Sequence, residues 1–255
     1  MQGIADQVNK YWDAHASRLN VDGKQWGSKE FFAHIKLEHD KMYAGANEIL
    51  NLDSLKGQSL LELGCGIGLD TIEFARHGAE VTSIDLSPTC LDLAKRFLAH
   101  HHLVATLEMA NAEELPYPPN RFDIVVARGI LMYTVNDLRI VDEILRVLKP
   151  GGKANILLHN RSSWYVLLAK LSGTNLFNEV EDPPVDRLYS VAEAQTMFGR
   201  FSSSQIGFDR FPSTISNRRG LAARLYNTVL VPITALVPIS FLRPFGYYII
   251  IEATK

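Results

Sequence analysis

Residues 59–85 read SLLELGCGIGLDTIEFARHGAEVTSID, and this stretch decides the fold because it alternates strand, glycine turn, helix and strand patterns. An apolar run at 59–63 enters the glycine turn at 64–68, and a helical pattern follows. A second β-rich run at 80–84 closes on Asp85. Glycines let the backbone approach a ligand closely, and an acid after the second strand can accept hydrogen bonds from both hydroxyls of a ribose. The stretch therefore predicts a βαβ unit that binds a nucleoside.

The glycine spacing separates two kinds of nucleotide site. Gly64, Gly66 and Gly68 form G-x-G-x-G, whereas a dinucleotide site has G-x-G-x-x-G with a helix N-terminus facing the pyrophosphate. Glu62 precedes the first glycine by two residues, where a carboxylate repels a pyrophosphate and attracts a cationic methionine group. The turn therefore favours a nucleoside that carries a cationic group over a dinucleotide.

The sequence ELGCGIG at 62–68, followed by SIDLS at 83–87, resembles motif I and the acidic motif of the class I S-adenosylmethionine (SAM) dependent methyltransferases. The resemblance implies that SAM is the cofactor. It also implies that residues of both motifs contact SAM, namely Glu62, Gly64, Cys65, Gly66, Gly68, Asp85 and Leu86. Methyl transfer from a sulfonium proceeds by in-line displacement, so the protein must align the reactants, and no metal is required.

A later segment resembles the part of the family that binds adenine. Residues 110–126, ANAEELPYPPNRFDIVV, follow a third alternating strand at 104–109 and are similar to the family segment gDAe-LPf…sFDvv. In the family the acid approaches the adenine amine, and the following backbone N–H meets the ring. Here Asn111 replaces the acid, and its side-chain oxygen can still accept a hydrogen bond from the amine. The resemblance places three residues at the adenine, namely Asn111, Ala112 and Glu113.

Residues 127–134, ARGILMYT, correspond to the family loop that lies beside the transferable methyl group. An acceptor that must lose a proton needs a base there, and we favour Tyr133 and His159 because they follow the fourth and fifth strands. His34 and His39 on an N-terminal helix are further candidates. Structural roles are the alternatives, with Tyr133 packing on adenosine and His159 capping its strand.

Two features near these strands complete the resemblance. Arg128 contacts the SAM carboxylate or an acidic substrate, or else it forms a structural ion pair. Residues 146–152, RVLKPGG, resemble a family turn in which Pro-Gly-Gly ends a helix and starts the fifth strand. Alternating strands and helices predict an α/β fold, a Rossmann-like doubly wound sheet with helices on both faces. The resemblance adds a seventh strand that runs antiparallel beside the sixth.

The N-terminal segment shows two helical patterns, at 5–15 and 29–50, separated by a polar turn at 20–28. This segment resembles the N-terminal cap of small-molecule methyltransferases, in which a tyrosine lies against the methionine end of SAM. The resemblance places Tyr11 over the ligand. The alternative is that Tyr11 and Trp12 are a hydrophobic staple on the core.

These patterns divide the chain into three parts. Residues 1–50 form a helical cap over the active site, residues 51–158 form the SAM-binding core, and residues 159–255 supply the remaining strands. The last part also contains two apolar insertions on the substrate side, 159–188 and 212–245.

Composition sets limits on the partners and the location. The chain has 255 residues, and 47% of them are hydrophobic, which supports a sizeable core. Its net charge of −2 gives no general attraction to nucleic acid. Two cysteines build no disulfide framework, and the polar N-terminus lacks the apolar core of a signal peptide. We expect a cytoplasmic protein.

Three consecutive histidines, His100–His102, end a surface helix. At that position, solvated side chains are favoured over a metal site.

The apolar segment 225–242 holds no charge and approaches the minimum length of a membrane span. Pro232 and Pro238 interrupt it, so we expect short helices that cover the active site or form a subunit contact. Peripheral membrane contact through 221–245 is the alternative. Together with the apolar helix expected at 164–171, this segment predicts a lipophilic acceptor.

The hypothesis from the sequence is a SAM-dependent methyltransferase that acts on a small, lipophilic acceptor. Two other classes stay open, namely a nicotinamide-dependent oxidoreductase with a similar βαβ unit and a non-catalytic SAM-binding scaffold. The fold supports methyl transfer to oxygen, nitrogen, carbon and sulfur, so the motifs alone select no acceptor atom.

Overall fold

The computed structural model describes residues 2–18, 23–42, 46, 49–164, 166–167, 170, 183–209, 228, 232 and 236–255. The elements in chain order are α1 (Gln2–Arg18), α2 (Lys29–Met42), η1 (Leu52–Leu55), β1 (Ser59–Leu63), α4 (Leu69–Arg76), β2 (Glu80–Asp85), α5 (Pro88–His100), β3 (Thr106–Met109), β4 (Phe122–Arg128), η2 (Leu131–Tyr133), α6 (Asp137–Val147), β5 (Leu148–His159), α8 (Val191–Met197), β6 (Ser203–Phe208), α11 (Ile239–Leu242), η4 (Arg243–Phe245) and β7 (Tyr248–Thr254).

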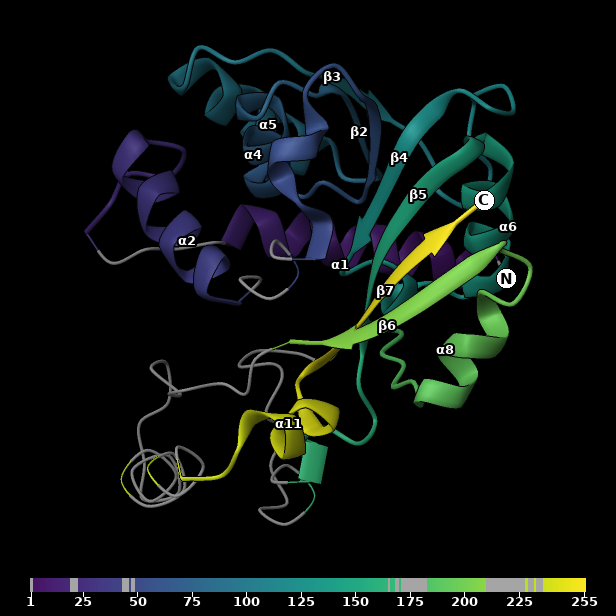
Figure 1. Cartoon of the computed structure of the whole chain (residues 1–255). Coiled ribbons are helices and arrows are strands. Elements are labelled where there is room, and N and C mark those ends of the chain that lie inside the picture. The colour runs from purple at the N-terminus through teal and green to yellow at the C-terminus, as the bar shows by residue number, and fades with distance from the viewer. Residues whose placement is uncertain are drawn as a thin grey trace.

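The strands of the described residues form one seven-stranded sheet, in which they lie in the order β3-β2-β1-β4-β5-β7-β6. The pairs from β3 to β5 are parallel, and β7 runs antiparallel to both of its neighbours, β5 and β6. Helices α4 and α5 lie on one side of the sheet, and α6 and α8 lie on the other (Figure 1). The predicted Rossmann-like doubly wound fold, with an antiparallel last strand beside the sixth, is confirmed.

Both faces of the sheet are buried because alternate residues of a strand point to opposite sides. Leu61 of β1 and Val125 of β4 join the cluster formed with α6 and α8, whereas Leu60 and Val126 join a second cluster with Phe74 of α4. All five side chains are at most 1% exposed. This two-sided burial accounts for the nearly continuous apolar runs that these strands show in the sequence.

The two N-terminal helices pack on α5 through different chemistry. Phe32 of α2 stacks on Phe97 of α5 with ring centroids 4.3 Å apart, and both rings are buried. Asp13 of α1 instead accepts hydrogen bonds from Ser87 Oγ at 2.6 Å and from Thr89 N at 3.1 Å, at the start of α5. These hydrogen bonds lower the pKa of Asp13. Helix α1 is therefore docked at the end of α5 that faces the carboxyl edge of the sheet.

The connection into β5 differs from the prediction. Pro-Gly-Gly at 150–152 is predicted to end the helix and start the strand, but α6 ends at Val147 and Leu148 already pairs with Phe122 of β4. The pairing resumes with Lys153, so the intervening residues form an irregularity inside β5. The reason is burial, since Leu148 is 0% exposed and joins the core before the turn.

Other boundaries shift by smaller amounts. The third strand begins at Thr106 instead of Val104, which is 88% exposed, and β6 ends at Phe208. Helix α2 is described to Met42, whereas the sequence predicts a helix to residue 50. Predictions on residues 171–182, on 210–227 and on most of 228–235 lie outside the described residues. Within the described part of the chain, no helix combines the length and apolarity needed to cross a membrane.

Gly66 and Gly68 form a matched pair for testing the glycine turn. Both have positive φ, +52° and +83°, so an alanine at either position costs about 1–2 kcal/mol of strain. A Cβ at Gly68 would also lie 2.9 Å from Ala94 Cβ of α5, whereas one at Gly66 would meet nothing within 4 Å. We predict that Gly68→Ala lowers the free energy of unfolding by about 1–3 kcal/mol more than Gly66→Ala, as measured by urea denaturation. Equal losses in the two variants would contradict a packing role for Gly68.

Candidate functional site

A cavity of about 500 Å³ lies at the carboxyl edge of the sheet. It is lined by the ends of β2, β4 and β5, by the glycine turn after β1, and by one side of α1. Ligands bind in such open α/β sheets at this edge, outside the carboxyl ends of the strands. Most of the predicted site residues line the cavity, namely Gly64, Gly66, Asp85, Leu86, Asn111, Ala112, Glu113, Arg128, Tyr133 and His159.

Asp85 lines this cavity and fixes the backbone on either side of it. Its Oδ2 accepts a hydrogen bond from Gly66 N at 2.8 Å, and its Oδ1 accepts one from Ser87 N at 2.9 Å. Burial raises the pKa of Asp85, although these amides favour the ionised form. Each carboxylate oxygen can accept more than one hydrogen bond, so Asp85 can also receive donors from a ligand.

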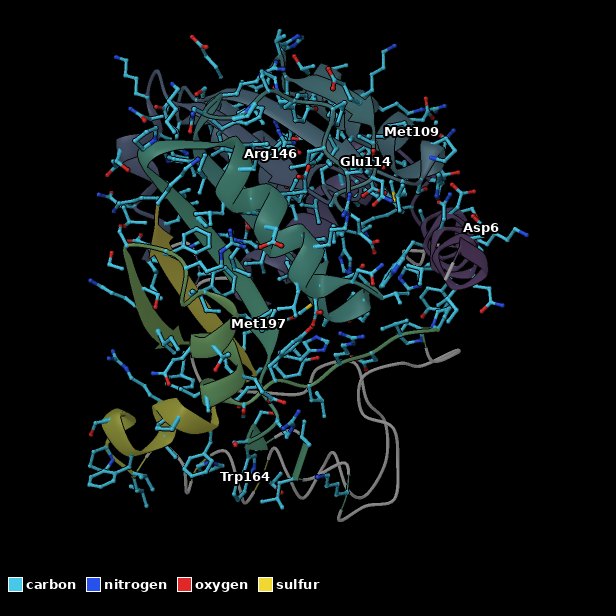
Figure 2. The ribbon with its side chains drawn as sticks, turned by 90° about the vertical axis from the view of Figure 1, so that its right-hand side faces the viewer. Asp6, Met109, Glu114, Arg146, Trp164 and Met197 are labelled. Carbon is cyan, nitrogen blue, oxygen red and sulfur yellow. The ribbon has the colours of Figure 1, made fainter. Side chains whose placement is uncertain are left out.

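Residues 111–113 line the cavity in a compact loop. Asn111 Oδ1 accepts a hydrogen bond from Glu113 N at 2.9 Å, and the Glu113 carboxylate accepts hydrogen bonds from Thr134 Oγ1 at 2.6 Å and Asn136 Nδ2 at 2.8 Å. Arg146 of α6, which is labelled in Figure 2, donates to the carbonyl of Leu115 at 3.0 Å. The loop is therefore anchored to the segment after β4, and Asn111 keeps a second lone pair for a ligand donor.

A smaller cavity of about 170 Å³ lies on the other side of the glycine turn and shares Gly64, Gly66 and Arg128 with the large one. Glu62 lines it and is 4% exposed. Its Oε2 accepts hydrogen bonds from Thr71 Oγ1 at 2.5 Å and Ser83 Oγ at 2.6 Å. Burial, reinforced by the nearby charge of Asp70, raises the pKa of Glu62 to about 7.

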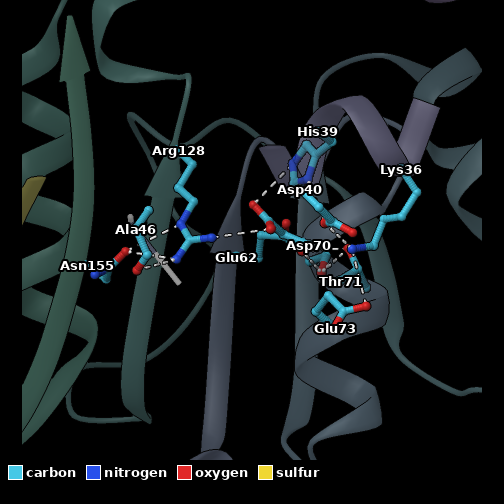
Figure 3. A network of polar contacts seen from close by, with 11 residues as sticks. Lys36, His39, Asp40, Ala46, Glu62, Asp70, Thr71, Glu73, Arg128 and Asn155 are labelled. Carbon is cyan, nitrogen blue, oxygen red and sulfur yellow. Dashed lines mark hydrogen bonds and ion pairs between the residues drawn. The ribbon is translucent and has the colours of Figure 1, made fainter. Parts of the chain in front are cut away.

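Arg128 takes part in a buried network beside this smaller cavity (Figure 3). Its guanidinium donates to Asp70 Oδ1 at 3.2 Å, to Asn155 Oδ1 at 3.3 Å and to the carbonyl of Ala46 at 3.3 Å. The structural ion pair, one of the two readings from the sequence, is therefore present. Arg128 also lines both cavities, so the ion pair does not remove it from the site.

Aromatic rings form the other end of the large cavity. The Trp12 ring lies 4.9 Å from that of Tyr133, and Tyr133 lies 5.5 Å from the ring of His159. His159 in turn lies 5.5 Å from Tyr247 and 5.6 Å from Tyr248. This chain of rings extends from α1 to the start of β7. His159 is 3% exposed, and its Nδ1 lies 3.1 Å from Asp186 Oδ1.

Comparisons with known proteins identify the family. A model of the methyltransferase domain matches residues 61–156. A ubiquinone biosynthesis O-methyltransferase from Nitrosococcus oceani is 30% identical over 162 residues, which cover 60% of this chain and 69% of that protein. The chain belongs to the class I SAM-dependent methyltransferases.

Two further comparisons extend this result. A ubiquinone biosynthesis O-methyltransferase from Coxiella burnetii is 31% identical over 125 residues, covering 49% of this chain and about half, 53%, of that relative. The solved structure of magnesium protoporphyrin IX methyltransferase from Synechocystis has a TM-score of 0.63 and 14% identity, covering 98% of this chain and 97% of that one. At 14% identity, the likeness to the magnesium protoporphyrin IX methyltransferase concerns the fold alone.

The site of this methyltransferase fits SAM by its donor set and its shape. A Cβ at Gly66 would meet nothing within 4 Å, so the turn leaves room for a ligand to approach the backbone. Asn9 Oδ1, on α1, is buried without a partner among the described residues and belongs to a residue that lines the large cavity. Asp85 would hold the ribose hydroxyls, and Glu62 and Arg128 would lie near the charged methionine end.

Some predicted residues lie elsewhere. Tyr11 and Gly68 are absent from the described linings of both cavities. Gly68 packs against α5, and Trp12, whose ring is 5.1 Å from that of Tyr11, reaches the large cavity instead. Cys65 and the candidate base His39 line the smaller cavity. His34 is exposed on α2, outside either lining.

Sequence reasoning missed two parts of the site. Val8, Trp12 and His15 line the large cavity from one side of α1, and their i, i+4, i+7 spacing is the helical pattern that identifies such a side. Tyr247 and Tyr248 line it from the start of β7, where no motif marks them. Asp186 also lacked any signal, because its partner His159 lies 27 residues earlier in the chain.

The raised pKa of Glu62 predicts how stability depends on pH. The folded value of about 7 lies above the ordinary value of 4.5, so the native state binds this proton more tightly than the unfolded chain. Its contribution is fully present below the unfolded pKa and is lost as the pH rises through the folded pKa, by at most about 1.4 kcal/mol per pH unit. We predict that Glu62→Gln flattens this slope, as measured by the free energy of unfolding from about pH 5 to about pH 8. An identical pH dependence in both proteins would refute the assignment.

Proposed function

We propose that this methyltransferase transfers the methyl group of SAM to a small, lipophilic acceptor. The observation that carries the proposal is the continuity of the large cavity, which runs from Asp85 and Asn111 at one end to Tyr133 and His159 at the other. A single cavity can therefore hold a nucleoside and an acceptor side by side. A non-catalytic scaffold does not need the aromatic end, and a nicotinamide-dependent oxidoreductase is not supported by the family.

Different residues contribute to different parts of the in-line displacement. Bound SAM supplies a methyl group on a cationic sulfur. Asp85 and the loop at 111–113 orient the nucleoside, while Glu62 complements the positive charge. Trp12 and Tyr133 bring α1 and the segment after β4 together across the cavity, which favours exclusion of water. Alignment of the acceptor with the carbon–sulfur bond then supplies much of the rate.

The character of the cavity supports a lipophilic acceptor with a flat ring. Apolar and aromatic side chains surround its acceptor end, namely Val8, Trp12, Ile130, Tyr133, Val135, Tyr247 and Tyr248. Aromatic rings favour offset-stacked or edge-on contacts with other rings. The names of the ubiquinone biosynthesis relatives point to the same chemical class, an aromatic ring that carries oxygen substituents.

We also propose that the protein works in the cytoplasm and contacts membranes peripherally. Cys65 and Cys90 are both free thiols, as a reducing compartment favours. Near the C-terminus, large apolar side chains are exposed on and before the short helices α11 and η4, with Leu236 84%, Phe241 70% and Phe245 47% exposed. Exposed apolar groups of this kind suit the headgroup boundary of a bilayer that carries a lipophilic acceptor.

Asp85→Asn tests the cofactor site. We predict that it weakens binding of S-adenosylhomocysteine (SAH) by about 10- to 100-fold, because a charged hydrogen-bond acceptor for the ribose is lost. Isothermal calorimetry measures the affinity, and Asp53→Asn, on exposed η1, is the matched control. Wild-type affinity in Asp85→Asn would contradict the cofactor assignment.

A second experiment tests methyl transfer itself. The protein is incubated with labelled SAM and a panel of phenols, hydroxylated quinones, amines and thiols. The absence of a labelled product with every acceptor would count against an enzyme.

Phe241→Ser combined with Phe245→Ser tests membrane contact. Full burial of a phenylalanine side chain contributes about 1.5–3 kcal/mol, so we predict at least a roughly tenfold loss of partition onto phosphatidylcholine vesicles that contain phosphatidylglycerol. Co-sedimentation measures the bound fraction. Val104→Ser, which changes a residue 88% exposed beside β3, should leave it unchanged. Equal binding by all three proteins, or none by the wild type, would argue against the contact.

A further inference from the structure

We propose that Asp186 is a positioning residue that holds His159 as the general base for a hydroxyl acceptor, so that the methyl group is transferred to oxygen. This inference rests on the proposed methyl transfer and names its substrate class. His159 is the last residue of β5 and lines the large cavity, with Asp186 Oδ1 3.1 Å from its Nδ1. Asp186 itself comes from a segment that carries no family motif.

The residues that follow Asp186 fix its segment relative to the histidine. Arg187 N donates to the carbonyl of Met132 at 2.9 Å, and the Arg187 guanidinium lies 2.9 Å from Asp137 Oδ2. Two residues further along, Tyr189 N donates to the carbonyl of His159 itself at 2.8 Å. The backbone next to Asp186 is thus bound to β5 and to the residues after β4, which places the Asp186 carboxylate beside the imidazole.

The pair determines which ring nitrogen can accept a proton. An ionised carboxylate only accepts hydrogen bonds, so a contact with Asp186 at Nδ1 selects the neutral tautomer that carries its proton on Nδ1 and its lone pair on Nε2. The rings of Tyr133, Tyr247 and Tyr248 pack around the imidazole with centroids 5.5–5.6 Å away and restrain its orientation. The carboxylate also stabilises the imidazolium that forms when Nε2 takes up a proton.

This arrangement suits a weakly acidic hydroxyl, such as a phenol. A phenol has a pKa near 10 and is a poor nucleophile at neutral pH unless a base removes its proton. The hydroxyl proton passes to Nε2, and the oxygen forms a bond to the methyl carbon as the carbon–sulfur bond breaks. The electron pair of that bond stays on sulfur. The products are a methyl ether, SAH and an imidazolium, which returns its proton to water.

The experiment compares two phenols in several variants of the full chain. Both are assayed at about pH 8, where one phenol, an alkylphenol, is still protonated and the other, a nitrophenol, is largely ionised and needs no base. For Asp186→Asn we expect kcat with the alkylphenol to fall about 10- to 100-fold, with KM and SAH affinity changed less than about threefold. Its kcat with the nitrophenol should fall less than about threefold, because no proton must be removed.

Further variants separate positioning from folding. His159→Gln should lower kcat with the alkylphenol by about 100- to 10,000-fold and again largely spare the nitrophenol. Asp186→Glu, which keeps the charge, should restore part of the rate lost in Asp186→Asn. Asp53→Asn is the control and should match the wild type with both phenols. Because the nitrophenol rate reports an intact site, a variant that unfolds is recognised by losing both activities.

The outcomes distinguish this inference from the proposed function. No loss in Asp186→Asn, or equal losses with both phenols in a variant that keeps its SAH affinity, overturns the role of Asp186. If the wild type methylates amines or thiols but neither phenol, the oxygen acceptor is wrong while methyl transfer stands. If the wild type methylates none of these acceptors, the proposed function itself is overturned.

Discussion

The Asp85 carboxylate holds together the two loops on which the rest of the site depends. One oxygen binds Gly66 N in the glycine turn, and the other binds Ser87 N at the start of α5. Ser87 Oγ then donates to Asp13 of α1 and accepts a hydrogen bond from Cys90 N. The position of α1, and with it the ring of Trp12 that lines the cavity, follows from this series of hydrogen bonds. A residue expected to bind ribose therefore also helps to fix the position of α1 relative to the sheet.

Buried charge on the other side of the turn is balanced in two different ways. Asp70 is paired with Arg128, so the desolvation of both is offset by their attraction and by hydrogen bonds. Glu62 instead accepts hydrogen bonds from the hydroxyls of Thr71 and Ser83, and burial raises its pKa to about 7. Among the described residues that line the smaller cavity, Glu62 is thus a carboxyl group without an ion pair, whereas Asp70 is paired with Arg128. A cation placed there would ionise Glu62 and relieve this cost, which is the electrostatic complement of the sulfonium and ammonium groups of SAM.

The sequence predicts the structural elements that are determined by neighbouring residues. It misses contacts between residues that lie far apart in the chain. The βαβ unit follows from periodicity and from the glycine turn within about thirty residues. Trp12 and Tyr11 are adjacent on a helix, about 100° apart, so which ring faces the cavity depends on the docking of Asp13 and not on the pair itself. The Pro-Gly-Gly turn was misplaced because burial of Leu148 outweighs the local turn signal. Asp186 meets His159 only through tertiary structure.

The two ends of the large cavity therefore differ in how the chain forms them. The proposed SAM end comes largely from consecutive segments of one chain region, and the family match at 61–156 covers Glu62, the glycine turn, Asp85, residues 111–113 and Arg128. The proposed acceptor end is assembled from α1, the segment after β4, the end of β5, the segment around Asp186 and the start of β7. Of these parts, only the segment after β4, with Ile130, Tyr133 and Val135, lies inside that match. Since interactions at the SAM end are shared by enzymes with unrelated acceptors, selection of the acceptor must rest on contacts outside the common segment. Among the described residues, we propose that His159 with Asp186, and Trp12 on the other side of Tyr133, make that selection.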